Sequence, residues 1–151
     1  MSLTLRSVGR DDLVPLARVH ALCFPEDPWD AAALSGVLAM AGAEARLAED
    51  GAHTVGLLFA AIVGDEAEIL TFGVAPASRR RGVGRALLAD LYVRARALGA
   101  TRVVLEVAAD NSMALALYES EGFRTVGLRN GYYHRERGPA IDAWLLRRTL
   151  T

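Results

Sequence analysis

The chain joins an apolar run to an amphipathic helix through an arginine-rich loop that contains two glycines. The apolar run covers residues 67–74 and is ended by Pro76, and the loop covers residues 79–85 with the sequence RRRGVGR. Beyond the loop, apolar residues at helical spacing form one helix face, and they are Leu87, Leu88, Leu91, Ala95 and Leu98. Gly99 then closes the helix. A strand, a glycine loop and a helix in this order predict a fold of mixed α and β structure.

The glycine loop has the features of an anion-binding site. Glycines at positions 82 and 84 let a phosphate approach the backbone closely, and a helix start presents unpaired N–H groups and the positive end of the helix dipole. Four arginines can add charge-assisted hydrogen bonds, and they are Arg79, Arg80, Arg81 and Arg85. We therefore predict a pyrophosphate site here. From this segment alone, the alternative is a solvated arginine turn at a helix start.

A dinucleotide-binding Rossmann site is the first competing interpretation of the loop. Such a site requires Gly-x-Gly-x-x-Gly and an acidic residue about 20 residues further on. Position 87 is leucine where the third glycine would stand, so a dinucleotide oxidoreductase is disfavoured.

The rest of the chain is predicted to form strands and helices around one sheet. Residues 3–8 alternate like a half-buried strand, and Asp11 or Asp12 can cap the helix that follows. The apolar positions of that helix are Leu13, Leu16, Val19 and Leu22. A shorter helix is predicted over 29–40, and an antiparallel meander over 43–48, 54–63 and 67–74.

The second half of the chain adds three strands and a helix. Residues 102–107 are apolar at almost every position, which predicts a strand buried on both faces. Asn111 can cap a helix that runs to about residue 121. The last strands are predicted over 125–128 and 142–150, joined by the polar segment 130–139. The fold class is therefore α+β.

Composition and charge exclude several classes of function. The formal net charge of −1 disfavours nucleic-acid binding through a broad basic surface. All 17 basic residues are arginine, so Schiff-base chemistry and the lysine of a P-loop are excluded. Cys23 is the only cysteine, and His20, His53 and His134 show no metal-ligand spacing, so no metal is expected.

No segment of the chain predicts a membrane protein or a secreted one. No apolar run approaches the roughly 20 residues of a membrane span, and residues 1–6 lack the pattern of a signal peptide. We expect a single cytoplasmic domain over residues 1–151. It should be a monomer, without direct nucleic-acid or membrane partners.

Motifs in the middle of the chain resemble those of the GNAT acetyltransferase superfamily. They are Arg79-x-x-Gly82-x-Gly84, Leu105-Glu106-Val107, Asn111 and Ala116-Leu117-Tyr118-Glu119-Ser120-x-Gly122-Phe123. Within the superfamily, the chain is similar to the RimI-type ribosomal-protein alanine N-acetyltransferases over almost its whole length, including His20-Ala21-x-x-Phe24-Pro25. The resemblance implies a mixed, mostly antiparallel sheet of six to seven strands, splayed at its centre and flanked by about four helices.

The resemblance also implies where acetyl-CoA binds. The cofactor would enter an opening between a strand that ends at residues 72–74 and a strand that ends at residues 105–107. Backbone groups around residues 73 and 74 would meet the pantetheine and the thioester, residues 80–85 the pyrophosphate, and Asn111 the cofactor arm further along. The implied cofactor-binding residues are Phe72, Gly73, Val74, Arg79, Arg80, Arg81, Gly82, Val83, Gly84, Arg85 and Asn111.

The same resemblance implies that Glu106 is the general base and Tyr118 the general acid. Glu106 is the only charge in the apolar run 103–109, and partial desolvation there would raise its pKa toward a useful range. Tyr118 lies two helical turns after Asn111, so one cofactor could contact both. The alternatives are an arginine-paired carboxylate at a strand end and a tyrosine that only fills the core.

Two departures from the RimI-type pattern concern the acceptor. Gly131 stands before Tyr132-Tyr133 where these proteins usually have asparagine, and Ile141 replaces an acidic residue. We expect Trp29, Tyr132 and Tyr133 to form apolar walls of the acceptor site, beside an acidic loop over residues 26–30 that attracts a cationic protein N-terminus. The alternative is a solvated acidic loop with Trp29 in the core.

The expected reaction is direct attack of a neutral amine on the acetyl thioester, with backbone N–H groups near Val74 stabilising the oxyanion. Deprotonating an α-amine of pKa ~7.8 at pH 7 costs about 1 kcal/mol, against about 4.6 for a lysine of pKa ~10.4, which favours a protein N-terminus such as that of a ribosomal protein. The alternatives are a small-molecule amine as acceptor and a non-catalytic acyl-CoA-binding module. A ping-pong route through Cys23 is disfavoured, because a lone cysteine in an apolar helix usually packs in the core.

Overall fold

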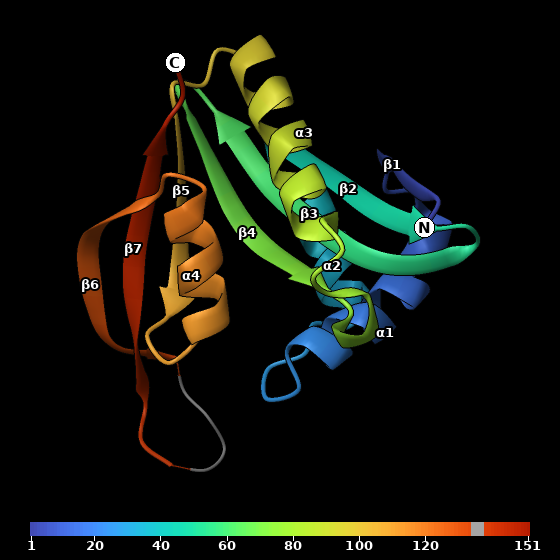
Figure 1. Ribbon diagram of the computed structural model, residues 1–151, viewed down its shortest axis with the longest axis horizontal. Coiled ribbons are helices and arrows are strands. Elements are labelled where there is room, and N and C mark those ends of the chain that lie inside the picture. Colours follow the sequence, from blue (N-terminus) through green and yellow to red (C-terminus); the bar gives the residue numbers. More distant parts are fainter. Residues whose placement is uncertain (134–137) are drawn as a thin grey trace.

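The computed structural model covers residues 1–151 and describes all of them except 134–137. Its centre is a sheet of seven strands in the order β1-β2-β3-β4-β5-β7-β6 (Figure 1). The strands are β1 (Leu3–Ser7), β2 (Ala43–Asp50), β3 (His53–Val63), β4 (Glu66–Val74), β5 (Arg102–Ala108), β6 (Arg124–Tyr133) and β7 (Ile141–Thr149). The helices of the described residues are α1 (Leu13–Cys23), α2 (Ala31–Leu38), α3 (Val83–Ala97) and α4 (Ser112–Ser120), with short 3-10 turns at Arg10–Asp12 and Pro76–Ser78.

Only one neighbouring pair of strands in the described sheet is parallel. β4 and β5 run in the same direction, and every other pair is antiparallel. The parallel pair is joined through α3, as a crossover between parallel strands requires. The predicted α+β class, with six to seven strands and about four helices, is confirmed.

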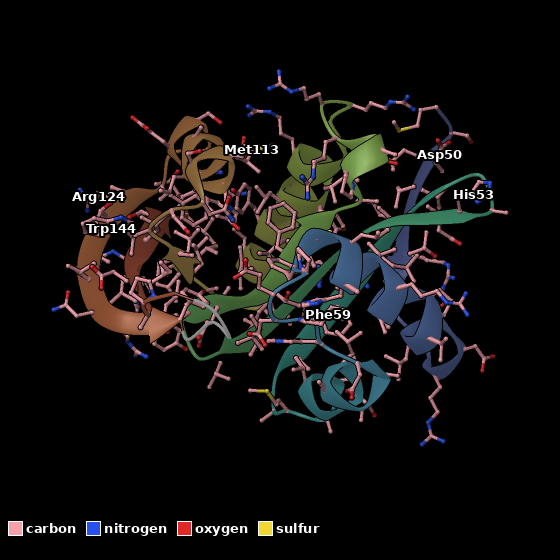
Figure 2. The ribbon with its side chains drawn as sticks, turned by 90° about the horizontal axis from the view of Figure 1, so that it is seen from below. Asp50, His53, Phe59, Met113, Arg124 and Trp144 are labelled. Atoms are coloured by element: carbon pink, nitrogen blue, oxygen red, sulfur yellow. The ribbon has the colours of Figure 1, made fainter. Side chains whose placement is uncertain are left out.

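Helices cover both faces of the sheet. In Figure 2, α3 and α4 lie on one side and α1 and α2 on the other, with Phe59 of β3 between the sheet and the second pair. Successive residues of β3 point to opposite faces, so Leu57 and Phe59 pack with α1 and α2, while Leu58 and Ala60 pack with α3. This double cover explains why β3 is a continuous apolar run.

Helix α1 corrects one predicted core position. Leu13, Leu16 and Val19 are buried as expected, but Leu22 is 61% exposed. The buried stripe is completed by His20, four residues after Leu16 and only 2% exposed. The predicted side-chain cap of α1 is also absent from the described residues. The Asp12 carboxylate instead accepts a hydrogen bond from the N–H of Gly9 and forms an ion pair with Arg6.

Strand β5 is buried on one face and not on both, which corrects the prediction for residues 102–107. Val103, Leu105 and Val107 are buried under α3 and α4, whereas Val104 and Glu106 point to a face that is only partly covered. An apolar run alone does not distinguish a strand with one covered face from a strand with two.

Other boundaries of helices and strands also differ from the predicted ones. Helix α2 is shorter than the predicted range 29–40, and Leu98 at the end of α3 is exposed. Strand β6 continues to Tyr133, so the first part of the predicted connection 130–139 is strand, and residues 134–137 of it lie outside the described residues. No helix in the described part of the chain combines the length and apolar character of a membrane span.

Candidate active site

Strands β4 and β5 separate after a short stretch of pairing. They pair only at Glu66↔Arg102, Ala67↔Val103 and Glu68↔Val104, while β4 remains paired with β3 and β5 with β7. The register between β3 and β4 shifts between Phe59 and Ala60, which leaves Leu70 as an extra residue on β4. Figure 1 shows the two strands diverging toward the end of β4. The central splay expected from the resemblance is therefore present.

The end of β4 directs backbone groups into this opening. The N–H of Ala75, which directly follows β4, bonds to the carbonyl of Val55 on β3, and successive residues of a strand point their N–H groups to opposite sides. The N–H groups of Phe72 and Val74 therefore point toward β5. The Val74 carbonyl accepts a hydrogen bond of 3.0 Å from Nε of Arg79, which ties the arginine-rich loop to the edge of the opening.

The start of α3 offers free N–H groups beside this edge. The first intrahelical bond runs from Ala86 to the Gly82 carbonyl, so Val83, Gly84 and Arg85 donate to no earlier turn of the helix. No side chain of the described residues caps this end. Arg80 and Gly82 both have positive φ, 64° and 83°, a backbone geometry that gathers N–H groups around an anion.

Gly84 makes a close contact between three elements. A Cβ at this position would lie 3.3 Å from Cζ of Phe72 on β4 and 3.7 Å from Cδ2 of Leu117 on α4. The first turn of α3, the end of β4 and the middle of α4 therefore meet at one point. This point lies where the opening reaches the α3 and α4 face of the sheet.

Glu106 lies on the opposite face of the sheet, toward α1 and α2. Its side chain is 21% exposed, and Oε1 is 3.3 Å from Nη2 of Arg129 on β6. Its other oxygen, Oε2, is buried and has no hydrogen-bond partner among the described residues. Glu106 borders a shallow hollow of about 280 Å³ that Glu68 and Arg129 also line. The carboxylate thus has one oxygen in an ion pair and one free to accept a proton.

Tyr118 lies on the α4 side of the opening. Its ring centroid is 6.1 Å from that of Phe72 and 5.3 Å from that of Phe123, and the residue is 6% exposed. Burial raises the pKa of the Tyr118 hydroxyl, with a smaller contribution from Tyr133. The hydroxyl therefore keeps its proton at neutral pH, which a general acid requires.

The end of β6 brings two tyrosines to the opening. Tyr132 and Tyr133 contact each other edge to face at 5.0 Å, and the Tyr133 hydroxyl donates to the backbone carbonyl of Glu106 at 3.4 Å. Burial, and then Tyr132, Glu106 and Asp27, raise the pKa of Tyr133 to about 12. The influence of Asp27 shows that the acidic loop after α1 lies near the end of β6.

Trp29 has a structural role as well as a place on this loop. Its backbone N–H donates to Nδ1 of His20 at 3.0 Å, and its ring stacks on the imidazole at 5.2 Å. Nε2 of His20 is 2.9 Å from Oγ1 of Thr71 on β4. Since Nδ1 accepts, Nε2 carries the proton and donates to Thr71. Burial lowers the pKa of His20 to about 4, so this bridge is neutral at pH 7.

Two expected cofactor residues have other contacts as well. Arg85 forms an ion pair of 2.8 Å with Glu121 and donates to Ser120 at 3.0 Å, so its guanidinium points to the end of α4. Its backbone N–H and the remaining N–H groups of its half-exposed guanidinium are left for a phosphate. Asn111 caps α4 through a 3.2 Å bond from the N–H of Ala114, as predicted, which leaves its amide NH₂ for a ligand. The side chains of Arg80 and Arg81 are exposed.

Cys23 lies against the end of β4. A Cβ on Gly73 would be 2.9 Å from its Sγ, so the absence of a side chain at position 73 allows this contact. Burial raises the pKa of the Cys23 thiol, and Arg79 offsets this only in part. A thiol held protonated is a poor nucleophile, which agrees with the expectation against a ping-pong route.

Gly131 explains one departure from the RimI-type pattern. Its φ is 61°, and its N–H donates to Oδ1 of Asp142 at 2.8 Å across a register shift between β6 and β7. Glycine and asparagine are the residues that adopt this left-handed conformation most readily. Exchanging one for the other therefore preserves the backbone path that leads into Tyr132.

Sequence reasoning missed Arg129 and Thr71. Both belong to the site only through contacts between distant strands and helices: Arg129 with Glu106, and Thr71 with His20. The charge of Arg129, directly after the weakly polar run 125–128, was a possible signal, but its partner could not be identified without the register of the sheet.

Several proteins with a similar sequence or fold are acetyltransferases. The sequence profile of the Acetyltransferase (GNAT) family matches residues 16–123. N-alpha-acetyltransferase RimI of Mycobacterium tuberculosis is 40% identical over 151 residues, which cover 97% of this chain and 92% of that protein. The crystal structure of the ribosomal-protein-S18-alanine N-acetyltransferase from Escherichia coli matches with a TM-score of 0.89 and 27% identity, over 99% of this chain and 94% of that chain. Arabidopsis thaliana NAA60, solved in complex with acetyl-CoA, shares the fold with a TM-score of 0.88 at 23% identity, over 99% of each chain.

Proposed function

Because the chain belongs to the acetyltransferase (GNAT) family and is an N-acetyltransferase, we propose that it moves the acetyl group of acetyl-CoA to the N-terminal α-amine of a protein. The relatives named for N-alpha and ribosomal-protein alanine acetylation support this acceptor. The observation that carries the proposal is the opening between β4 and β5, which has a free carboxylate oxygen on one face of the sheet and a buried phenol on the other.

The described residues fit acetyl-CoA. In this proposal, the unpaired N–H groups of Val83, Gly84 and Arg85 bind the pyrophosphate, assisted by the exposed guanidinium groups of Arg80 and Arg81. The edge of β4 at residues 72–74 binds the pantetheine arm, and the free amide of Asn111 binds further along. Acetyl-CoA supplies an activated thioester, so the protein has only to orient it and to move protons.

The two faces of the sheet separate the two proton transfers. Glu106 takes a proton from the acceptor amine on the α1 and α2 face, directly or through water, and the N–H of Val74 stabilises the oxyanion. Tyr118 donates its proton to the departing thiolate on the α4 face. A base and an acid on opposite sides of one opening suit direct transfer, which needs both groups in one step and no covalent enzyme intermediate.

The acceptor site in this proposal lies between the loop after α1 and the end of β6. Tyr132 and Tyr133 provide an apolar wall, and Asp27 lies near enough to influence Tyr133. Trp29 stacks on His20, so it supports the loop from behind as well as bordering the site. A cationic N-terminus would be attracted by the negative charge of Asp27 and Glu106.

The test compares acceptors with radiolabelled acetyl-CoA and purified protein. Peptides that differ only in their first residue are offered beside free polyamines and aminoglycosides. We expect acetylation of peptides at the α-amine, with at least about tenfold higher kcat/KM than for any small amine. Activity on a small amine without activity on any peptide would refute the protein acceptor.

The base assignment is tested by Glu106→Gln, with Glu68→Gln as the matched control from the same hollow. We expect Glu106→Gln to lower kcat at pH 7 about 100-fold or more, as loss of a general base does, and Glu68→Gln to have a much smaller effect. Unchanged turnover of Glu106→Gln at all pH values would show that another group removes the proton.

A further inference from the structure

Arg129 contacts both the carboxylate of Glu106 and the ring of Tyr132, which borders the proposed acceptor site. Its Nη2 is 3.3 Å from Oε1 of Glu106, and its guanidinium carbon lies 5.1 Å from the centre of the Tyr132 ring. A cation at this distance over an aromatic ring is attracted to it. Arg129 is therefore held by two partners, although 53% of its side chain is exposed.

Negative charge surrounds this contact. Glu68 lines the same hollow as Glu106, and burial together with the charge of Glu106 raises the pKa of Glu68, while Arg129 lowers it. The other arginine nearby, Arg102, forms an ion pair of 3.0 Å with Glu66 and not with Glu106. The charged and titratable groups that lie around Glu106 on the neighbouring elements are Glu66 and Glu68 on β4, Arg102 on β5, Tyr132 and Tyr133 on β6, Arg147 on β7 and Asp27 after α1. Among the described residues, Arg129 alone forms an ion pair with Glu106.

The two oxygens of the Glu106 carboxylate have different surroundings because of this pair. Oε1 is held by Arg129, and Oε2 is buried without a partner among the described residues. A carboxylate with a long side chain has several rotamers, and a single ion pair to a group that is itself fixed on an aromatic ring removes much of that freedom. The free oxygen is thus the one available to accept a proton.

We propose that Arg129 is a positioning residue that holds Glu106 through Oε1, offsets the negative charge of Glu68 beside it, and leaves Oε2 as the proton acceptor. The role rests on the proposed function of Glu106 as the base. Arg129 itself touches neither the amine nor the thioester. Without its positive charge, Glu106 would face Glu68 alone, and two like charges close together favour protonation of one of them.

The test measures kcat and kcat/KM against pH for Arg129→Gln and Arg129→Lys. For Arg129→Gln we expect the acidic limb of both profiles to move up by about one pH unit, since a half-exposed opposite charge has an effect at the low end of the usual range. We also expect the plateau of kcat to fall about tenfold because the base is less well oriented. Arg129→Lys should return the acidic limb to within about 0.3 of a pH unit of the wild type while restoring the plateau only in part.

Arg124→Gln is the matched control, because Arg124 is an exposed arginine on the same strand, outside the hollow that Glu106 lines. Its pH profile should equal that of the wild type. If Arg129→Gln does not fold, as judged by circular dichroism, Arg129→Met keeps the aliphatic stem over Tyr132 and replaces it in the test. An acidic limb that stays in place in a folded variant without this charge would overturn the proposal.

A double-mutant cycle separates this proposal from the assignment of the base. In a Glu106→Gln background, a further Arg129→Gln change should alter kcat less than about twofold, because Arg129 acts through the group already removed. Fully additive losses would refute the positioning role. If Glu106→Gln alone leaves kcat unchanged, the base assignment itself fails, which is a distinct result from an unmoved acidic limb in Arg129→Gln.

Discussion

Acidification should destabilise this protein through His20. The imidazole is 2% exposed, donates to Thr71 and accepts the N–H of Trp29, so a second ring proton would remove the acceptor and place a charge in the core. Its pKa is lowered from 6.5 to about 4 by burial. At about 1.36 kcal/mol per pH unit, this difference corresponds to about 3 kcal/mol of unfolding free energy.

The sign follows from which state binds the proton. Between pH 6.5 and about 4 the unfolded chain has a protonated imidazole and the native chain does not, so stability falls as the pH falls. The contribution of His20 is complete above pH 6.5 and is lost through this window. Protonation of Nδ1 removes the acceptor of the Trp29 N–H, whereas Nε2 still donates to Thr71, so the loop after α1 should lose its attachment to His20.

The assay is urea unfolding at several pH values from 8 to 4, for the wild type and for His20→Gln. Glutamine keeps a donor toward Thr71 but does not titrate. We expect the wild type to lose about 3 kcal/mol more than the variant over this window. Since all carboxylates are common to both proteins, their titration cancels in the comparison. His53→Gln, which changes an exposed histidine at the start of β3, should follow the wild type. Parallel curves for the wild type and His20→Gln would refute the reasoning.

Two further predictions concern the acid and the backbone. Tyr118→Phe retains the ring contacts with Phe72 and Phe123 and removes only the hydroxyl, so kcat should fall about 10- to 100-fold with little change in the KM for acetyl-CoA. Tyr92→Phe removes the other buried phenol, which bonds to Glu121, and should leave kcat near the wild-type value; equal kcat losses in the two variants would contradict the role of Tyr118. Gly42→Ala should cost about 3 kcal/mol or more in urea unfolding, because φ is 73° and the new Cβ would overlap the Ile62 carbonyl. Gly51→Ala, at φ 61° in open space, should cost only about 1 kcal/mol. Equal losses of stability in the two variants would show that backbone strain, and not the overlap with Ile62, determines the cost.

Local patterns in the sequence predicted most of the helices and strands. The meander β2-β3-β4, helix α3 after the glycine loop and the Asn111 cap of α4 all follow from apolar spacing and from residues with special backbone preferences. These signals are local, because turns, caps and the period of burial depend on a few neighbouring residues. They fail where burial depends on a distant element, as for Leu22, which lies beyond the helix stripe completed by His20.

Side-chain partners were beyond the reach of sequence reasoning. Arg85 stays a predicted phosphate residue, but its ion pair with Glu121, 36 residues later, could not be foreseen from the loop alone. The contact between Arg129 and Glu106 likewise depends on β7 pairing with both β5 and β6. Long side chains can reach several partners, and the register of the sheet decides which of these are close.

The sequence by itself determined the family and the class of reaction and predicted the segments that form the site, because glycine loops, caps and motif spacing are properties of neighbouring residues. The tertiary structure decided how the strand pair β4 and β5 opens and which face each group occupies. After three paired positions the two strands follow different partners, and this separation places Glu106 on one face and Tyr118 on the other. A strand pairs with whichever neighbour offers its backbone groups in register, and that choice is made between segments far apart in the chain.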